Sequence, residues 1–395
     1  MTQPQPDVFI YNAAILTPQI TLQKGWIHLV NGLIHAIGTE QEYDIYSSKL
    51  GADTEKIDAK GSWVLPGFID MHVHGGYGHD FMDADAEGLD AITHFHGMNG
   101  TTTMLATTVT AAKEELDHVL QRIGSYRNQA MPYAQLLGVH LEGPFINANW
   151  CGAQNPAFIV PPQPDWLSDW TQRFPGLIRM QTLAPEAAGA LDYIEALVKH
   201  GIIAALGHTD ANYEQVNTAI EHGLSQAVHT YNAMRGLHHR EPGAVGAIMS
   251  NPAILGEIIA DGHHVHPTAI RLLVQAKGPE GVLLITDAMS AAGLGNGEYE
   301  LGGLAVIVRD GVARLKEGNS LAGSTLTMID AFRFVVQQVG VSIEHASLMA
   351  SGNQARQLGI DQTTGSLQPG LQADVLLVNS ELELERVWIG GRSIQ

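Results

Sequence analysis

Six side chains of the 395-residue chain are of types that bind divalent metal ions, and each stands at or just beyond the end of a short apolar segment. They are His72, His74, Glu142, His208, His229 and Asp287. Imidazole nitrogens and carboxylate oxygens suit zinc and related divalent ions. A metal ion held by such groups lowers the pKa of a water molecule to roughly 7 and polarises a carbonyl, which is the chemistry that amide hydrolysis requires.

The spacing of these residues supports a shared site. His72 and His74 are two residues apart, so both side chains point to the same face of an extended chain. If the preceding segments are strands of a parallel barrel, their carboxyl ends meet at one mouth, where catalytic groups lie. A structural role for all six residues would require six coincidences at one end of the barrel. The remaining histidines in helix patterns or at helix ends are expected to be structural: His94, His96, His118, His200 and His222.

The elements that position these residues alternate between two patterns. Amphipathic helix patterns occupy 112–123, 187–199, 213–222 and 268–276. Short apolar strands are expected at 67–70, 102–106, 136–139, 177–180, 202–206, 226–228, 255–259 and 282–285. This alternation predicts an α/β fold, a (β/α)8 barrel of the TIM type.

Both ends of the chain have strand patterns instead. Asn31-Gly32 between two apolar segments is a strong hairpin signal, and Gly390-Gly391 closes the last strand pattern. We therefore expect a small β-sandwich domain built from residues 1–62 and 359–395, around a barrel of residues 63–358. A β-hairpin insertion is expected near 297–318, after the eighth strand.

The composition narrows the classes of function. The net charge of −20 opposes binding of nucleic acid phosphates. A single cysteine excludes an intrachain disulfide and a thiolate zinc cluster. No apolar segment approaches the roughly 18 residues that a membrane span needs, and residues 1–7 lack the features of a secretory signal. A cytoplasmic protein without membrane or nucleic acid partners is expected.

Several motifs resemble the amidohydrolase superfamily and, within it, the N-acetylglucosamine-6-phosphate deacetylase family. His-x-His at 72–74 is common to many amidohydrolases. His-Leu-Glu-Gly-Pro at 140–144, Asn-Ala-Met at 232–234 and Arg-Glu-Pro-Gly at 240–243 are typical of the deacetylases. The resemblance covers nearly the whole chain. It implies hydrolysis of N-acetyl-D-glucosamine 6-phosphate to D-glucosamine 6-phosphate and acetate.

The resemblance also implies roles for the metal-binding residues. Glu142, His208 and His229 would hold the principal ion, with Zn²⁺ expected and Fe²⁺, Mn²⁺ or Co²⁺ as alternatives. His72 and His74 leave a second ion open, with Glu142 bridging the two ions and Asp287 shared. Asp287 would be the general base.

A basic cluster suggests how an acidic protein binds a phosphorylated sugar. It consists of Arg235, His238, His239 and Arg240, for which a solvated loop is the alternative. The resemblance implies a homodimer in which one subunit's arginine reaches the partner's site. The expected substrate contacts are Gln154, Asn232, Ala233, Arg240, His264 and Ala322.

Gln154 departs from the family pattern, which has a histidine at this position to polarise the acetyl carbonyl. Glutamine can still donate a neutral hydrogen bond. The departure leaves reduced activity or an altered substrate open, and it is the only feature that favours a non-catalytic scaffold. An N-acetylgalactosamine-6-phosphate deacetylase or another amidohydrolase also stays open, because the motifs do not specify the stereochemistry of the sugar ring. Cys151, beside Trp150, is expected to be a packed side chain rather than a nucleophile.

Overall fold

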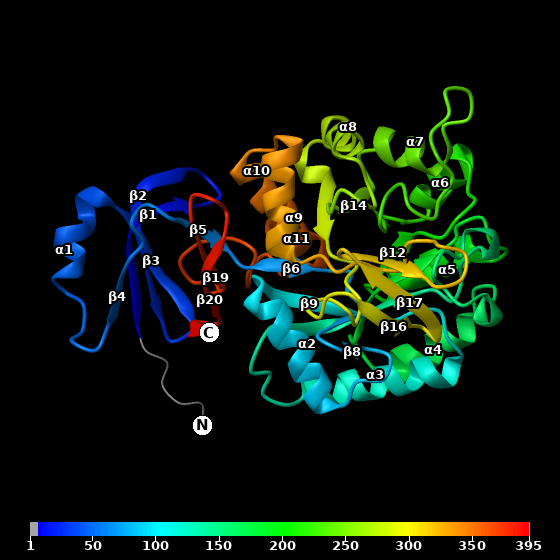
Figure 1. Cartoon of the computed structure of the whole chain (residues 1–395), viewed down its shortest axis with the longest axis horizontal. Coiled ribbons are helices and arrows are strands. Elements are labelled where there is room, and N and C mark those ends of the chain that lie inside the picture. Colours follow the sequence, from blue (N-terminus) through cyan, green and yellow to red (C-terminus); the bar gives the residue numbers. More distant parts are fainter. Residues whose placement is uncertain (1–6, 395) are drawn as a thin grey trace.

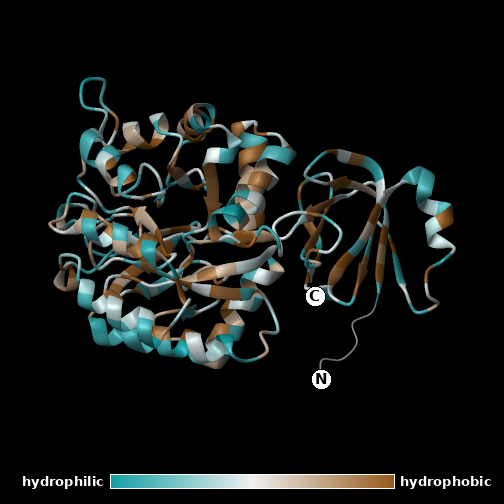
Figure 2. Cartoon of the chain, turned by 180° about the vertical axis from the view of Figure 1, so that it is seen from behind, coloured by the Kyte–Doolittle hydropathy of each residue, from teal (hydrophilic) through white to brown (hydrophobic). Residues whose placement is uncertain are grey.

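A computed structural model describes residues 7–394, so residues 1–6 and 395, which fall in the expected β domain, lie outside the described part. Strands from the two ends of the chain lie together on one side, and the central part forms a larger body beside them (Figure 1). Apolar segments concentrate in the strands, whereas hydrophilic residues mark the outer helices (Figure 2).

The central body contains eight parallel strands whose order in the sheet follows the chain. They are β6 (Phe68–Asp70), β9 (Thr101–Thr107), β10 (Gln135–Glu142), β11 (Ile178–Leu183), β12 (Ile203–Leu206), β13 (Gln226–Ala227), β14 (Leu255–Ile259) and β15 (Val282–Ile285). All eight predicted strands are confirmed, with shifts at their ends. The fold is a (β/α)8 barrel.

Helices connect successive strands. The connecting helices are α2 (Ala86–Met98), α3 (Lys113–Arg127), α4 (Pro164–Arg173), α5 (Ala190–Lys199), α6 (Tyr213–Glu221), α7 (Gly243–Ser250) and α8 (Pro267–Lys277), and α9 (Met328–Phe334), α10 (Ile343–Ser347) and α11 (Asn353–Leu358) follow β15. The four predicted helix patterns correspond to α3, α5, α6 and α8. None of the helices within residues 7–394 combines the length and apolar character that crossing a bilayer requires.

The first and last strands meet where the barrel closes. The backbone N–H of Asp287 donates to the carbonyl of His72 (2.8 Å), and the N–H of His74 donates to the carbonyl of Ala288 (2.8 Å). These bonds join the segments that follow β6 and β15. Closure of the barrel therefore places three of the expected ligands side by side.

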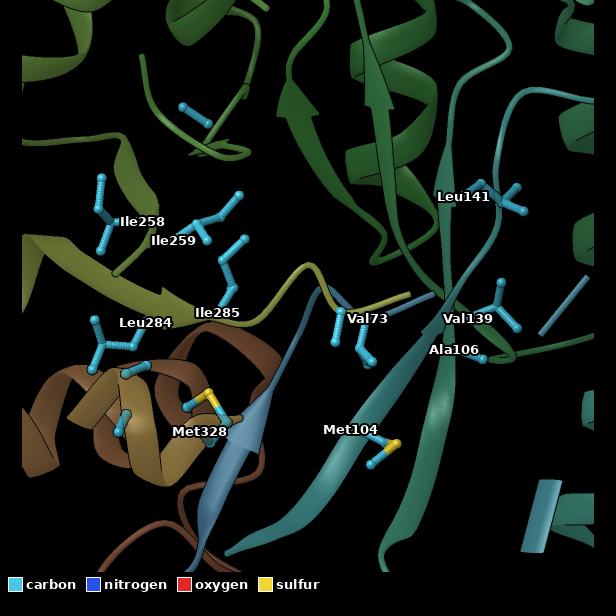
Figure 3. Close-up of a cluster of buried hydrophobic side chains, with 14 of the residues drawn as sticks. Val73, Met104, Ala106, Val139, Leu141, Ile258, Ile259, Leu284, Ile285 and Met328 are labelled. Atoms are coloured by element: carbon cyan, nitrogen blue, oxygen red, sulfur yellow. The ribbon is translucent and has the colours of Figure 1, made fainter. Parts of the chain in front are cut away.

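The barrel is held by apolar side chains between its strands and the surrounding helices. Val139 and Leu141 of β10 and Leu284 of β15 belong to this core, and Met328 of α9 lies beside Leu284 (Figure 3). Every second residue of a strand faces this outer core because side chains alternate along an extended chain. The intervening residues are left to face the interior of the barrel.

The terminal segments form one hydrogen-bonded sheet. Its order is β21-β20-β19-β5-β1-β2-β3, with β4 also paired to β1. The bounds are β1 (Val8–Leu16), β2 (Thr21–Val30), β3 (Leu33–Thr39), β4 (Glu55–Asp58), β5 (Trp63–Pro66), β19 (Val375–Val378), β20 (Leu384–Ile389) and β21 (Arg392–Ser393). The predicted hairpin at Asn31-Gly32 joins β2 to β3, and both residues have positive φ, 51° and 81°.

β5 links the two ends of the chain, because it pairs with β1 in parallel and with β19 in antiparallel orientation. A sheet-rich part formed from both termini is thus present as expected, and the domain boundaries at 62/63 and 358/359 remain a prediction. The insertion after β15 contains three antiparallel strands, β16 (Gly297–Leu301), β17 (Leu304–Arg309) and β18 (Val312–Leu315), where a hairpin was expected.

Candidate metal centre and substrate cavity

All six expected metal-binding residues meet at the carboxyl ends of the barrel strands. His72 and His74 follow β6, Glu142 ends β10, and the other three follow β12, β13 and β15. The six side chains are buried and form two groups, within each of which the candidate ligand atoms lie within 4.8 Å of one another. One group is His72, His74 and Asp287, and the other is Glu142, His208 and His229.

The alternation of side chains explains why these residues face the mouth. Val73, between His72 and His74, belongs to the outer apolar core, as does Leu141, which precedes Glu142. Placing these aliphatic side chains outward turns their neighbours inward. The sequence of the strands thereby orients the polar groups.

Glu142 lies at the centre of the two groups. Its Oε1 is 3.0 Å from Nε2 of His229, 3.2 Å from Nε2 of His208 and 3.3 Å from Nε2 of His72. Its Oε2 is 3.3 Å from Nε2 of His74. One carboxylate therefore contacts four imidazole rings.

The proton position of His208 indicates that these contacts require a positive charge. Nδ1 of His208 is 2.9 Å from the carbonyl oxygen of Trp150, which can only accept, so Nδ1 carries the proton. In a neutral His208, Nε2 then directs its lone pair at Glu142. The same nitrogen lies 3.1 Å from Nε2 of His229. Facing lone pairs repel one another unless a cation lies between them. The donor set fits a divalent metal ion.

Electrostatics keep both carboxylates ionised. Burial by itself raises the pKa of Glu142, but without a bound ion the positive field of a protonated His72 and hydrogen bonds donated by His208 and His229 outweigh it and hold that pKa well below its ordinary value. Burial likewise opposes ionisation of Asp287, and the neighbouring His72 and His74 lower its pKa. Oδ1 of Asp287 is 3.1 Å from Nε2 of His74.

Three of the six residues have an uncommon backbone conformation. The φ angles of His208, His229 and Asp287 are 48°, 30° and 50°. For residues with a side chain such a conformation costs of order 1–3 kcal/mol, and it persists where the surroundings enforce it, often at functional sites.

Gln154 is buried beside Glu142. Its Oε1 accepts the backbone N–H of Thr110 (2.6 Å), which fixes the orientation of the amide. Its Nε2 then donates to Oε2 of Glu142 (2.6 Å). The glutamine at this position thus holds the carboxylate of Glu142 in place, in addition to facing the cavity.

A cavity of about 370 Å³ opens over the two groups. This volume lies in the range of small-molecule sites. Asn232, Ala233 and His264 line it, as expected for substrate contacts. Ala322 does not: it is buried in an apolar cluster with the insertion, while its neighbours Leu321 and Gly323 reach the cavity.

The expected basic cluster divides into two parts. Arg235 is neutralised by Asp210, with Nη2 2.8 Å from Oδ2. Asp210 also accepts the indole N–H of Trp150, so this ion pair supports the segment that carries Gln154. Arg240 is exposed and does not line the cavity of its own chain. Its loop, just before α7, projects away from the barrel (Figure 1).

Thr110, Trp150 and Glu257 contact the predicted site residues and were not predicted themselves. Thr110 and Trp150 act through backbone atoms, to which sequence patterns give no access. Glu257 had a visible signal, because it is a carboxylate in the middle of the apolar strand β14. Its Oε2 is 2.9 Å from Nδ1 of His72.

A (β/α)8 barrel with two histidine–carboxylate groups at its mouth defines a metal-dependent hydrolase of the amidohydrolase type. The family model described as "Amidohydrolase family" matches residues 63–394, and the chain belongs to this family. Within it, the chain groups with the N-acetylglucosamine-6-phosphate deacetylases.

Three relatives illustrate the similarity. The chain is 38% identical to N-acetylglucosamine-6-phosphate deacetylase of Bacillus subtilis (strain 168), over 96% of this chain and 94% of that protein. It is 41% identical to N-acetylgalactosamine-6-phosphate deacetylase of Escherichia coli O157:H7, over 83% and 87%. A Mycobacterium smegmatis N-acetyl-D-glucosamine-6-phosphate deacetylase mutant, solved in complex with N-acetyl-D-glucosamine-6-phosphate, superposes with a TM-score of 0.91 at 34% identity, covering 98% and 99%.

Proposed function

We propose that the chain hydrolyses the N-acetyl amide of N-acetyl-D-glucosamine 6-phosphate, giving D-glucosamine 6-phosphate and acetate. The observation that carries this proposal is the meeting of six metal-binding side chains in one cavity of a chain whose relatives are deacetylases of 6-phosphorylated N-acetylhexosamines.

Glu142, His208 and His229 hold the principal divalent ion in this proposal, and His72, His74 and Asp287 form the place for a second one. Nitrogen and carboxylate donors at a barrel mouth favour Zn²⁺, and Fe²⁺, Mn²⁺ and Co²⁺ accept the same donors. Such an ion lowers the pKa of a water molecule and polarises the amide carbonyl.

Asp287 is the group we assign as general base and acid. Its ionised carboxylate takes a proton from the attacking water as the new C–O bond forms at the acetyl carbon. It then delivers that proton to the amine nitrogen as the C–N bond breaks. The lowered pKa of Asp287 supports this role, because the carboxylate is ionised before attack.

Gln154 serves two purposes in this scheme. One N–H of its amide donates to Glu142, and the Thr110 contact prevents the amide from rotating away. The second N–H of the same amide is the donor we assign to the acetyl carbonyl. A neutral donor here replaces the histidine of the family pattern.

The phosphate contacts are Asn232, Ala233 and His264, with Arg240 supplied by a partner subunit. An exposed arginine on a projecting loop supports this arrangement, since Arg240 does not reach the cavity of its own chain. Ala322 contributes by placing Leu321 and Gly323 against the substrate. We accordingly propose a homodimer, acting in the cytoplasm, where a charged sugar phosphate is retained.

One assay separates the alternatives: release of primary amine from N-acetylglucosamine 6-phosphate and from N-acetylgalactosamine 6-phosphate, with metal content measured on the same sample. Faster turnover of the gluco sugar is expected. The similarity to the E. coli relative makes the galacto sugar the second candidate, and faster turnover of that sugar would identify it as the substrate. A protein with neither metal nor turnover would be a non-catalytic scaffold.

A further inference from the structure

Glu257 lies deep in the barrel beneath the two metal-binding groups. It is the middle residue of β14, whose sequence is Leu-Gly-Glu-Ile-Ile, and its side chain is fully buried. The next residue, Ile258, packs in the outer apolar core, so the alternation along β14 turns Glu257 inward. Burying a carboxylate away from water costs free energy unless hydrogen bonds or opposite charges compensate it.

The contacts of Glu257 connect both groups. Its Oε2 is 2.9 Å from Nδ1 of His72 and 3.4 Å from the backbone nitrogen of His229. Its Oε1 accepts from Nε2 of Gln226 at 2.6 Å. Oε2 of Glu257 thus contacts one candidate ligand from each group, His72 and His229.

The contact with His72 determines which nitrogen of that ring is free. An ionised carboxylate only accepts, so Nδ1 of His72 carries the proton. In the neutral ring, which is the form that binds a metal ion, Nε2 then directs its lone pair toward Glu142 and Asp287, at 3.3 and 3.6 Å from their oxygens. This buried Nε2 has no hydrogen-bond partner among the described residues.

We propose that Glu257 is a positioning residue of the metal centre: it holds His72 in the tautomer and orientation that bind a metal ion. This inference rests on the proposed metal-dependent function. The carboxylate also draws electron density toward Nδ1 and so strengthens Nε2 as a donor, as outer carboxylates do for metal-binding histidines elsewhere.

The test is zinc binding rather than activity. Metal-free parent, Glu257→Gln, His72→Ala and the double variant are titrated with Zn²⁺ against a chromophoric chelator. Glu257→Gln preserves the shape of the side chain and removes its charge. We expect it to weaken the more weakly bound Zn²⁺ by roughly 10- to 100-fold. In the His72→Ala background, which keeps only the principal ion, the same substitution should change the affinity for that ion by less than about threefold, because its effect passes through His72.

Asp374→Asn is the matched control. Asp374 is also a buried carboxylate, but it bonds to Thr364 and to the backbone N–H of Gly390, both outside the metal-binding groups. This variant should lose stability and keep the parent's zinc affinities. Gln226→Met is a second variant, since it frees Oε1 of Glu257 while retaining the charge, and it should weaken the second Zn²⁺ severalfold.

The possible outcomes distinguish a failure of this inference from a failure of the proposed function. A parent protein that binds no Zn²⁺ would remove the proposed function and the inference together. Parent-like affinities in Glu257→Gln, or in Gln226→Met if the first variant does not fold, would overturn the inference alone. A tenfold or larger loss of affinity for the principal ion in the His72→Ala background would also overturn it, because Glu257 would then act on the fold rather than on His72.

Discussion

Glu142 connects the two metal-binding groups at the scale of single residues. Its two oxygens face imidazoles from four separate positions of the chain, and Gln154 holds Oε2 from the side. Removing one ligand from such a set leaves the remaining donors without the geometry that an ion needs. The consequences differ between the groups.

Glu142→Ala and His208→Ala should each abolish bound metal and activity, since each removes a donor of the principal ion. His72→Ala should retain the principal ion and lose any second one. Metal content per chain, measured after dialysis against Zn²⁺, checks this. The exposed His118 provides the control, because His118→Ala should bind as the parent does. Full metal content in Glu142→Ala would refute the ligand assignment.

Asp287→Asn should keep at least one metal ion and bind substrate, yet lose turnover by roughly 10² to 10⁴, the usual contribution of a positioned acid or base. The amide retains the size of the carboxylate but cannot accept the proton. Steady-state kcat and metal content are measured on the same sample. Turnover within a few-fold of the parent would exclude Asp287 as the base.

At the scale of elements, α2 supports the segment that follows His74. Nε2 of His96 donates to the carbonyl of Gly75 (2.9 Å), the residue at which the short strand β7 (Gly75–Gly76) begins. Burial lowers the pKa of His96 to about 4, and the bond to Gly75 offsets only part of that effect. The ring is neutral in the folded state and becomes protonated more readily on unfolding.

The stability of the protein should therefore fall as the pH decreases from about 6.5 toward 4. In this window the unfolded state binds the proton and the folded state does not, so unfolding becomes more favourable. His96→Gln keeps an N–H donor and cannot titrate. It should reduce the difference in unfolding free energy between pH 7.5 and 5 by about 2 kcal/mol, measured by urea denaturation.

The exposed His200 gives the matched control for this experiment. His200→Gln should reproduce the parent's dependence of stability on pH, because its ring does not support a buried contact. The same slope in the His96→Gln and parent proteins would show that His96 is not the titrating group in this window.

At the scale of the whole molecule, the net charge of −20 opposes a phosphorylated substrate. Arg235 cannot offset this charge, because Asp210 already pairs with it. The exposed Arg240 is the remaining arginine of the basic cluster, and its loop projects toward solvent (Figure 1). An assembly that brings this loop to a second subunit's cavity would supply the missing positive charge.

Arg240→Ala should lower kcat/KM for the phosphorylated sugar by roughly 10- to 150-fold, since a charge-assisted contact to phosphate contributes about 1.5–3 kcal/mol. The slow reaction of unphosphorylated N-acetylglucosamine should be unchanged. Arg309→Ala, which removes an exposed arginine of the insertion, is the control. Equal kcat/KM for both sugars in the parent would defeat the phosphate assignment.

Mixed dimers test whether Arg240 acts across the interface. Inactive Asp287→Asn subunits mixed with Arg240→Ala subunits should regain activity, because one site of the mixed dimer then has both intact groups. Activity that stays at the weighted mean of the two variants after subunit exchange would place Arg240 in its own chain's site.

Local patterns in the sequence determined the strands, four of the helices, the hairpin at Asn31-Gly32 and the positions of the six candidate metal ligands. The physical reason is that alternation, helical periodicity and turn chemistry act over a few residues, and a parallel barrel brings every strand end to one mouth. Six polar residues at strand ends were therefore enough to predict that these side chains meet at the barrel mouth.

Tertiary structure alone decided which distant groups meet. The closure that joins His72 to Asp287 spans more than half the chain, and Thr110 fixes Gln154 through a backbone N–H. Asp210 neutralises Arg235, which had the sequence signature of a phosphate contact. Glu257 reaches His72 from β14, 185 residues further along the chain. Hydrogen bonds and ion pairs depend on distances of about 3 Å between atoms far apart in sequence, and only packing of the complete barrel sets those distances.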